Sequence, residues 1–207
     1  MGGGCNNMSI AGLILAGGAS RRMGAPKPLL KLDGETFLDR LISVFRPCCD
    51  PVMVVLGFDA DRIRAGLRRA SEARFVVNPE PERGQLSSMQ CGLREMPPEV
   101  EAAVFTPVDY PRVRPATVRR LVEAFQQQRG TCVVVVPTCE GLRGHPVCIA
   151  REIFPEFLAL PAESQARDVI HRYAGRTRYV EVGDSGILRD VDDPQAYREL
   201  QGPDAQS

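Results

Sequence analysis

The 207-residue sequence has little histidine, no tryptophan and no excess of either charge. Its two histidines, His145 and His171, argue against a histidine-based metal site or a Ser-His-Asp triad. Lys and Arg together number 26, and so do Asp and Glu, which gives a formal net charge of zero at pH 7. A neutral chain has no overall field that attracts nucleic acid or an anionic membrane. Any anionic ligand must therefore be held by local charges.

Long apolar runs and metal-binding cysteine motifs are also absent. No stretch approaches the ~18 apolar residues of a membrane span, and residues 1–9 lack the basic flank and apolar run of a signal peptide. The seven cysteines show neither a CxxC motif nor a zinc-like Cys/His spacing. Reduced thiols in a cytoplasmic protein are expected, and a strained redox pair of the adjacent Cys48 and Cys49 is the alternative.

Composition and length describe one globular domain. Hydrophobic residues make up 43% of the chain and charged residues 25%, and no internal repeat or Pro- or Ser-rich linker divides it. A chain of this length can bury a core without disulfide or metal staples. We expect a domain over residues 9–201, with disordered tails at residues 1–8 and 202–207.

Short apolar runs alternate with segments of helical spacing in the first two thirds of the chain. The runs are continuous, which predicts strands buried on both faces, as in a parallel sheet. The expected strands are residues 10–16, 52–56, 74–77, 102–105 and 132–136. The expected helices between them are residues 36–45, 59–69, 85–95 and 117–127. This alternation predicts an α/β fold with a mainly parallel, doubly wound sheet flanked by helices.

After Pro137 the order is less regular. We expect strands at residues 144–150 and 178–182, helices at 151–160 and 164–173, and a last helix from about Pro194 with Asp192 or Asp193 as its cap. In open α/β sheets, ligands gather at the carboxyl ends of the strands. The residues that follow each strand are therefore the candidates for a site.

The first expected strand runs into a glycine-rich loop that ends in a lysine, residues 15–27 (LAGGASRRMGAPK). The loop matches neither GxxxxGK[ST] nor GxGxxG, and the missing GxGxxG argues against a dinucleotide-dependent oxidoreductase. Its glycines let the backbone approach an anion, while Arg22 and Lys27 add positive charge. We interpret the loop as a polyphosphate site; the alternative is a glycine turn with solvated basic residues.

Carboxylates follow two later segments. Asp109 lies just after the strand expected at residues 102–105, and if that strand neighbours the first one, its carboxylate can ligate Mg²⁺ on a triphosphate. The alternative is a cap or turn before Pro111. Asp190 and Asp192 lie on one side of an extended segment, where either can complete the metal site; a capping cluster for the last helix is the competing interpretation.

Small polar residues open the helix expected at residues 85–95. Ser87 and Ser88 follow Gly84 and can donate to a base or a phosphate, or simply cap the helix. The chemistry of the side chains alone leaves both possibilities open.

Taken together, these motifs resemble those of the MobA-like NTP transferases, which include the molybdenum cofactor cytidylyl- and guanylyltransferases. The family pattern LA(A/G)GxSxRMGxxK matches residues 15–27 at every defined position. Further family landmarks follow in order along nearly the whole chain. They are the glycine and serines before a helix (Gly84, Ser87, Ser88, Gly92), D-x-P (109–111), GHPV (144–147) and D-x-D-x-P-x-x-Y (190–197).

The resemblance implies a Rossmann-like domain of the nucleotide-diphospho-sugar transferase type. It implies that a phosphate of an acceptor attacks the α-phosphorus of an NTP and expels pyrophosphate, with Mg²⁺ as cofactor. The implied catalytic residues are Arg22, Lys27 and Asp109, the implied metal ligands are Asp109 with Asp190 or Asp192, and His145 is placed on the acceptor side. The implied nucleotide-binding residues are Leu15, Ala16, Gly17, Gly18, Ser20, Arg22, Met23, Gly24, Lys27, Gly84, Ser87, Ser88 and Asp109.

The resemblance leaves the substrates open. Leu-Ala-Gly-Gly at residues 15–18 is a form found in guanylyltransferases, whereas GHPV and the terminal motif are more similar to the cytidylyl branch, which favours CTP over GTP. The GDxGAR stretch of cytidylyl relatives has only AESQAR here, residues 162–167. Molybdopterin is the expected acceptor, with a sugar phosphate or another cofactor phosphate as alternatives. A molybdoenzyme or its chaperone is a further partner, and a non-catalytic nucleotide-binding partner or chaperone is the alternative from another class.

Overall fold

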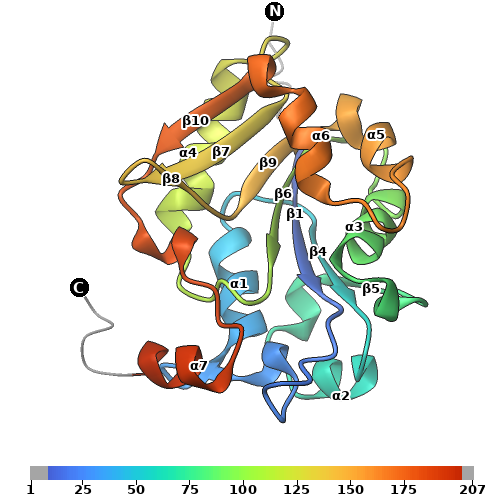
Figure 1. Ribbon diagram of the computed structural model, residues 1–207, viewed down its shortest axis with the longest axis vertical. Helices are drawn as coiled ribbons and strands as arrows, with labels where there is room; N and C mark the ends of the chain where they lie inside the picture. Colours follow the sequence, from blue (N-terminus) through green and yellow to red (C-terminus); the bar gives the residue numbers. More distant parts are fainter. Residues whose placement is uncertain (1–8, 202–207) are drawn as a thin grey trace, which may run out of the picture.

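A central sheet with helices on both faces forms the body of the molecule (Figure 1). The computed structural model describes residues 9–201, so the tails expected at residues 1–8 and 202–207 lie outside the described residues. The strand order is β10-β7-β9-β6-β1-β4-β5, and β8 pairs with β7 beside this path. The strands are β1 (Ser9–Ala16), β4 (Val52–Leu56), β5 (Arg74–Val77), β6 (Val100–Pro107), β7 (Val134–Cys139), β8 (Leu142–Arg143), β9 (Val147–Ala150) and β10 (Thr177–Glu181). The α/β fold with a mainly parallel sheet is confirmed.

β1 is the centre of the parallel part of the sheet. It pairs in parallel with β4 on one side and with β6 on the other, and β4 pairs in parallel with β5. The sheet changes direction at β9, which pairs antiparallel with both β6 and β7. The strand expected at residues 144–150 therefore exists over its second half, with an orientation opposite to that of its neighbours.

The helices divide between the two faces of the sheet. They are α1 (Phe37–Phe45), α2 (Ala60–Ala65), α3 (Gln85–Arg94), α4 (Pro115–Gln127), α5 (Phe154–Leu158), α6 (Ala166–Arg172) and α7 (Pro194–Leu200). A Cβ at Gly12 of β1 would meet Phe45 of α1, whereas the next residue, Leu13, lies against Gly92 of α3. Because successive strand residues point to opposite faces, α1 and α3 cover opposite sides of β1.

Several expected elements differ in extent or environment. The run at residues 74–77 is an edge strand rather than one buried on both faces, and Val77 is 58% exposed. The helix expected at 59–69 ends at Ala65, because the backbone N–H of Gly66 closes it on Arg62. Residues 151–160 form a 3₁₀ turn (Arg151–Ile153) and the short helix α5, with Pro155 in its first turn.

A small hairpin near the first loop was not predicted. β2 (Lys31–Leu32) and β3 (Glu35–Thr36) pair antiparallel across a two-residue turn, Asp33-Gly34. Both turn residues have positive φ, 53° and 81°, the combination that an Asp-Gly hairpin turn favours. The dipeptide was therefore a readable signal.

The last helix begins as expected, and the structure decides which aspartate caps it. The carboxylate of Asp193 accepts hydrogen bonds from the backbone N–H groups of Gln195 (2.9 Å) and Ala196 (2.8 Å). Asp192 is not the cap, so its carboxylate is available for another role.

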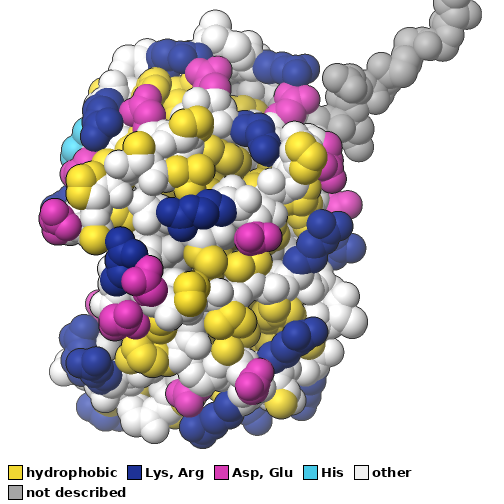
Figure 2. Space-filling view, turned by 90° about the vertical axis from the view of Figure 1, so that its right-hand side faces the viewer, with side chains coloured by type: hydrophobic (Ala, Val, Ile, Leu, Met, Phe, Trp, Pro, Cys, Tyr) yellow, Lys and Arg dark blue, Asp and Glu magenta, His cyan; other side chains and the backbone are white. Residues whose placement is uncertain are grey.

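Basic and acidic side chains are mixed on the surface of the described residues (Figure 2), as expected for a chain with no net charge. Figure 2 shows basic and acidic side chains interspersed over one face, with apolar side chains between them. No helix in residues 9–201 is long and apolar enough to cross a membrane. Cys48 and Cys49 are free thiols, and burial raises the pKa of Cys49, which disfavours the reactive thiolate.

A glycine-to-alanine change tests the close packing of the C-terminal segment on the sheet. A Cβ at Gly186 would run into the backbone carbonyl group of Arg112, a neighbour that cannot rotate away. We expect Gly186→Ala to lower the free energy of unfolding by about 1–3 kcal/mol, measured by urea denaturation. Gly175→Ala is the matched control, because a Cβ there meets nothing within 4 Å. Equal stability of the two variants would contradict this packing.

Candidate active site

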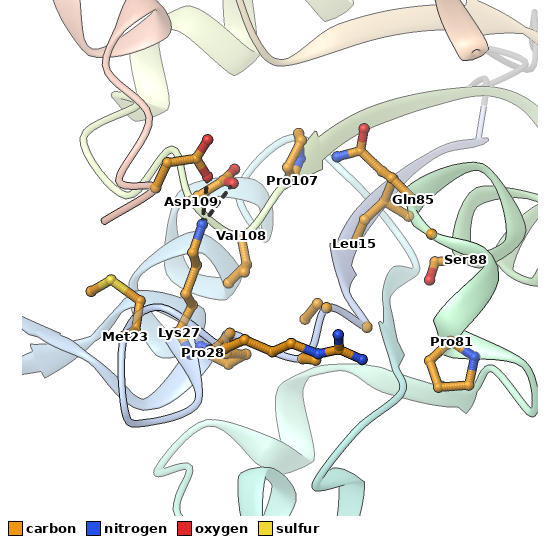
Figure 3. Close-up of a pocket in the computed structure, with 18 of the residues that line it drawn as sticks. Leu15, Met23, Lys27, Pro28, Pro81, Gln85, Ser88, Pro107, Val108 and Asp109 are labelled. Carbon is orange, nitrogen blue, oxygen red and sulfur yellow. Dashed lines mark hydrogen bonds and ion pairs between the residues drawn. The ribbon is translucent and has the colours of Figure 1, made fainter. Parts of the chain in front are cut away.

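A cavity of about 380 Å³ opens at the carboxyl ends of β1 and β6 (Figure 3). Its position follows from the sheet, because the two strands are parallel neighbours and Val108 N–H donates to Leu15 O at 3.0 Å. The expectation that Asp109 lies beside the first loop is thereby confirmed. Four segments line the cavity, with these residues: Leu15–Met23, Lys27, Pro28, Pro81, Gly84, Gln85, Ser88, Pro107–Asp109 and Asp192.

The glycine-rich loop folds back on itself through a serine. Ser20 has a positive φ of 50°, and its Oγ accepts a hydrogen bond from the backbone N–H of Lys27 at 2.9 Å. Ser20 therefore holds Lys27 in place as well as lining the cavity. Gly17 lies so close to α3 that a Cβ there would stand 2.6 Å from Ser88 Oγ, so a larger residue would force the Ser88 side chain to shift. Gly24 makes the left-handed turn of the loop (φ 67°) but does not line the cavity.

Lys27 is the meeting point of three distant segments. Its ammonium group donates to Asp192 Oδ1 at 2.6 Å and lies 3.4 Å from Asp109 Oδ2. These residues come from the end of the first loop, from the turn after β6 and from the segment before α7. Figure 3 shows the Asp109 carboxylate facing the nitrogen of Lys27 at the edge of the cavity. The structure thus brings together Lys27, Asp109 and Asp192 as the sequence predicts.

The two carboxylates have different environments. Burial raises the pKa of Asp109, Lys27 opposes that shift, and the charge of Asp192 adds to it. The hydrogen bond from Lys27 lowers the pKa of Asp192, whose side chain is half exposed. Asp109 Oδ1 is buried and has no hydrogen-bond partner. An unpartnered carboxylate oxygen beside a second carboxylate is a donor set that suits a hard divalent cation.

The third aspartate is not part of this pair. Asp190 does not line the cavity, and residues 9–201 contain no group of three or more His, Cys, Asp or Glu side chains arranged around a common metal position. A cation here would have two protein carboxylates and would take its other ligands from phosphate and water.

Asp192 is fixed on both sides in the chain. The N–H of Val191 donates to Asp109 O at 2.9 Å, which ties the two acidic segments together. On the other side, α7 is anchored by Tyr197, whose hydroxyl donates to Lys31 O (2.9 Å) and accepts from Lys31 N (3.2 Å). Figure 1 shows α7 (red) beside the early segment of the chain. Lys31 is four residues after Lys27. The contact between Tyr197 and Lys31 therefore holds both partners of the Lys27–Asp192 ion pair in place.

The two serines of α3 have separate environments. Ser88 is buried and lines the cavity, whereas Ser87 does not line it and donates to Gly84 O at 2.8 Å. Asn78 Nδ2 donates to Ser87 Oγ (2.8 Å) and Ser88 Oγ (3.1 Å), and so fixes the start of α3 against the end of β5. Asn78 was not among the predicted residues; its position one residue after a strand was the available signal.

A second cavity, also about 380 Å³, contains the predicted acceptor-side histidine. The His145 ring lies 4.9 Å from the Tyr110 ring and 5.7 Å from the Phe105 ring, centroid to centroid. Basic and aromatic side chains also line this cavity: Arg143, Arg167, His171 and Tyr179. Arg143 stacks on the Tyr179 ring at 4.5 Å. His145 is therefore separate from the first cavity and belongs to a cationic, aromatic one.

His145 is neutral at pH 7 in this environment. Burial lowers its pKa to about 4, and its Nδ1 is buried without a hydrogen-bond partner. An uncharged imidazole can accept or donate one hydrogen bond to a ligand.

This environment makes the stability of the fold depend on pH. Because the unfolded chain binds a proton at His145 near pH 6.5 and the folded chain only near pH 4, stability is lost as the pH falls through that window, by on the order of 3 kcal/mol at most. We expect urea unfolding of His145→Gln to change less between pH 7 and pH 4 than that of the wild type. The same substitution at the exposed His171 is the control; identical pH profiles for wild type and His145→Gln would contradict the burial of a neutral histidine.

Comparison with known proteins finds similar sequences and structures. The family model described as MobA-like NTP transferase domain matches residues 12–177. The molybdenum cofactor cytidylyltransferase of Escherichia coli (strain K12) is 22% identical over 89% of this chain and 92% of its own length. A probable molybdenum cofactor guanylyltransferase of Chloroflexus aggregans is 32% identical over 56% of this chain and 54% of its own length.

Solved structures agree in fold over nearly the whole chain. A crystal structure of the Mycobacterium tuberculosis H37Rv protein Rv0371c superposes with a TM-score of 0.82 and 29% identity, covering 94% of this chain and 97% of that one. A second structure of that protein, in complex with manganese, gives a TM-score of 0.78 with 26% identity, covering 94% and 98%. With the family model matched over most of the described residues, this chain belongs to the family of the MobA-like NTP transferase domain and is a nucleotidyltransferase.

Proposed function

We propose that this nucleotidyltransferase moves the nucleoside monophosphate of CTP to the phosphate of molybdopterin, with Mg²⁺ as cofactor and pyrophosphate as the leaving group. The observation that carries the proposal is the cluster of Lys27, Asp109 and Asp192 at the edge of the glycine-lined cavity. Fixed positive charge and a cation-binding carboxylate pair lie there beside a loop whose backbone can approach phosphates.

The first cavity accounts for triphosphate binding. Gly17 and Gly18 line the cavity and have no side chains of their own, and Arg22 and Lys27 supply local positive charge in a chain whose net charge is zero. Phosphoryl transfer asks a protein mainly for positioning and charge neutralisation. These residues suit that task, and no side-chain nucleophile is needed.

Asp109 and Asp192 would hold the cation. The orphaned Oδ1 of Asp109 and the half-exposed carboxylate of Asp192 fit an oxygen-seeking divalent ion, and the manganese complex of Rv0371c supports a metal in this family. Bound Mg²⁺ supplies charge neutralisation for the phosphate oxygens. Lys27 and a cation would compete for the same two carboxylates, so Lys27 would be available to the phosphates once a cation is bound.

The second cavity accounts for the acceptor. Its guanidinium groups, Arg143 and Arg167, suit a phosphate, and its rings, Phe105, Tyr110 and Tyr179, suit a flat heterocycle. An oxygen of the acceptor phosphate forms the new bond to the α-phosphorus, and the bond from that phosphorus to the β-phosphate oxygen breaks. The attacking oxygen of the acceptor phosphate is already anionic, so no general base is required.

A relative and a motif support CTP, and other relatives and another motif point to GTP. The cytidylyltransferase of Escherichia coli matches nine tenths of this chain, and GHPV at residues 144–147 is similar to that branch. The guanylyltransferase matches are of shorter extent but higher identity, and Leu-Ala-Gly-Gly at residues 15–18 is a form found in that branch. GTP and sugar phosphates are therefore included in the test.

The proposal is tested by incubating the full chain and Mg²⁺ with each NTP in combination with molybdopterin or a sugar phosphate and measuring pyrophosphate. We expect release with CTP and molybdopterin. Release only with GTP, or only with a sugar phosphate, would replace the proposed substrates. If an NTP raises the Tm but no combination of NTP and acceptor releases pyrophosphate, the proposed enzymatic activity is wrong. A nucleotide-binding partner or chaperone is then favoured.

Substitution of the buried carboxylate separates catalysis from folding. We expect Asp109→Asn to lower kcat at least about 10²-fold and to weaken Mn²⁺ binding, because it removes a charge that faces the cation. Its stability should change little, since the substitution keeps the side-chain shape. Glu101→Gln is the matched control: Glu101 lies on β6 far from the site and also pairs with a basic side chain, Arg129. Normal turnover by Asp109→Asn would show that the metal assignment is wrong.

A further inference from the structure

The two proposed substrate cavities both share wall residues with a third cavity. It has a volume of about 250 Å³ and shares Leu15 with the first cavity and Phe105, Gln165 and Ala166 with the acceptor cavity. Within residues 9–201, Gln85 is the one residue that lines all three. Gln85 therefore lies on the border between the two proposed substrate cavities.

Gln85 is held at this junction by its backbone, and its side chain is free to interact. It is the first residue of α3, after Gly84, whose φ of 87° turns the chain into the helix. Its side chain is exposed and makes no hydrogen bond to another described residue. In Figure 3 the amide of Gln85 is directed toward the side of the cavity where Pro107 ends β6.

The surroundings give this amide a distinct chemical role. The third cavity is lined by apolar side chains and by four polar ones, Arg83, Gln85, Ser164 and Gln165, and of these four only Gln85 also lines the first cavity. A primary amide offers two N–H donors and carries no charge, so it can bind phosphate oxygens without forming an ion pair. In the proposed reaction two phosphates must meet, and donors placed where charge develops stabilise the transition state.

We propose that Gln85 is a catalytic residue that donates hydrogen bonds from Nε2 to oxygens of the reacting phosphates, the α-phosphate of the NTP and the phosphate of the acceptor. The inference rests on the proposed function and adds to it the residue that brings the two substrates together. It also places the bond-forming step between the end of β6 and the start of α3, rather than deep in either cavity.

The test compares Gln85→Leu and Gln85→Glu with the wild type, in the full chain, with the active NTP and acceptor. We expect Gln85→Leu to lower kcat about 10²-fold, while the Kd for the NTP alone changes less than about twofold. Gln85→Glu should lose more activity than Gln85→Leu, because its carboxylate repels the phosphates although it has the shape of glutamine. If Gln85 mattered only for the shape of the cavity wall, Gln85→Glu would instead retain more activity than Gln85→Leu.

The control is Gln126→Leu, the same change at an exposed glutamine on α4 that lines none of the three cavities. A kcat for Gln85→Leu equal to that of the wild type overturns the inference, and so does a loss confined to the Kd for the NTP. The proposed function fails separately, if the wild type itself releases no pyrophosphate with any substrate pair, and the Gln85 assignment then falls with it.

Discussion

The ion pairs of one lysine organise the candidate site. The ammonium of Lys27 lies between Asp109 and Asp192, which are separated from it by 82 and 165 positions in the sequence. Bringing them together requires β1 and β6 to be neighbours and the last segment of the chain to return to the first loop. The backbone bond from Val191 to Asp109 and the contact of Tyr197 with Lys31 provide that return. A chain with no net charge thus concentrates charge of both signs at one edge of its sheet.

The change of direction at β9 separates the two binding regions. The parallel strands β1, β4 and β6 end at the glycine-rich loop and the carboxylates, as ligand sites in open α/β sheets do. Beyond β6, the segment before the antiparallel β9 carries His145 and Arg143 into a second cavity. The fold therefore places a cavity lined by the glycine-rich loop and a cationic, aromatic cavity side by side, and Gln85 lines both. Such an arrangement suits a reaction that joins two phosphorylated molecules.

Sequence patterns of a few residues predicted most strands of the sheet and the residues that follow them. The apolar runs gave the strands of the sheet, and the strand-end rule gave the loop, Asp109 and their proximity. The edge position of the strand at residues 74–77 could not be predicted from its own sequence. Whether a strand has a neighbour on both sides depends on the order of all strands in the sheet. That Asp192 lies beside Lys27 could likewise not be predicted, because its position depends on the long-range backbone hydrogen bond from Val191 to Asp109. Gln85 was not singled out by any sequence motif. Only its position in the walls of three cavities distinguishes it.

The most direct measurement of the central claim is the affinity for Mn²⁺ in the absence of nucleotide, determined by calorimetry on the wild type and on Lys27→Met. If Asp109 and Asp192 form a cation site that Lys27 neutralises in the free protein, removal of the ammonium leaves two carboxylates without a partner. The account then predicts tighter Mn²⁺ binding by Lys27→Met than by the wild type. Unchanged or weaker binding by the variant would contradict it.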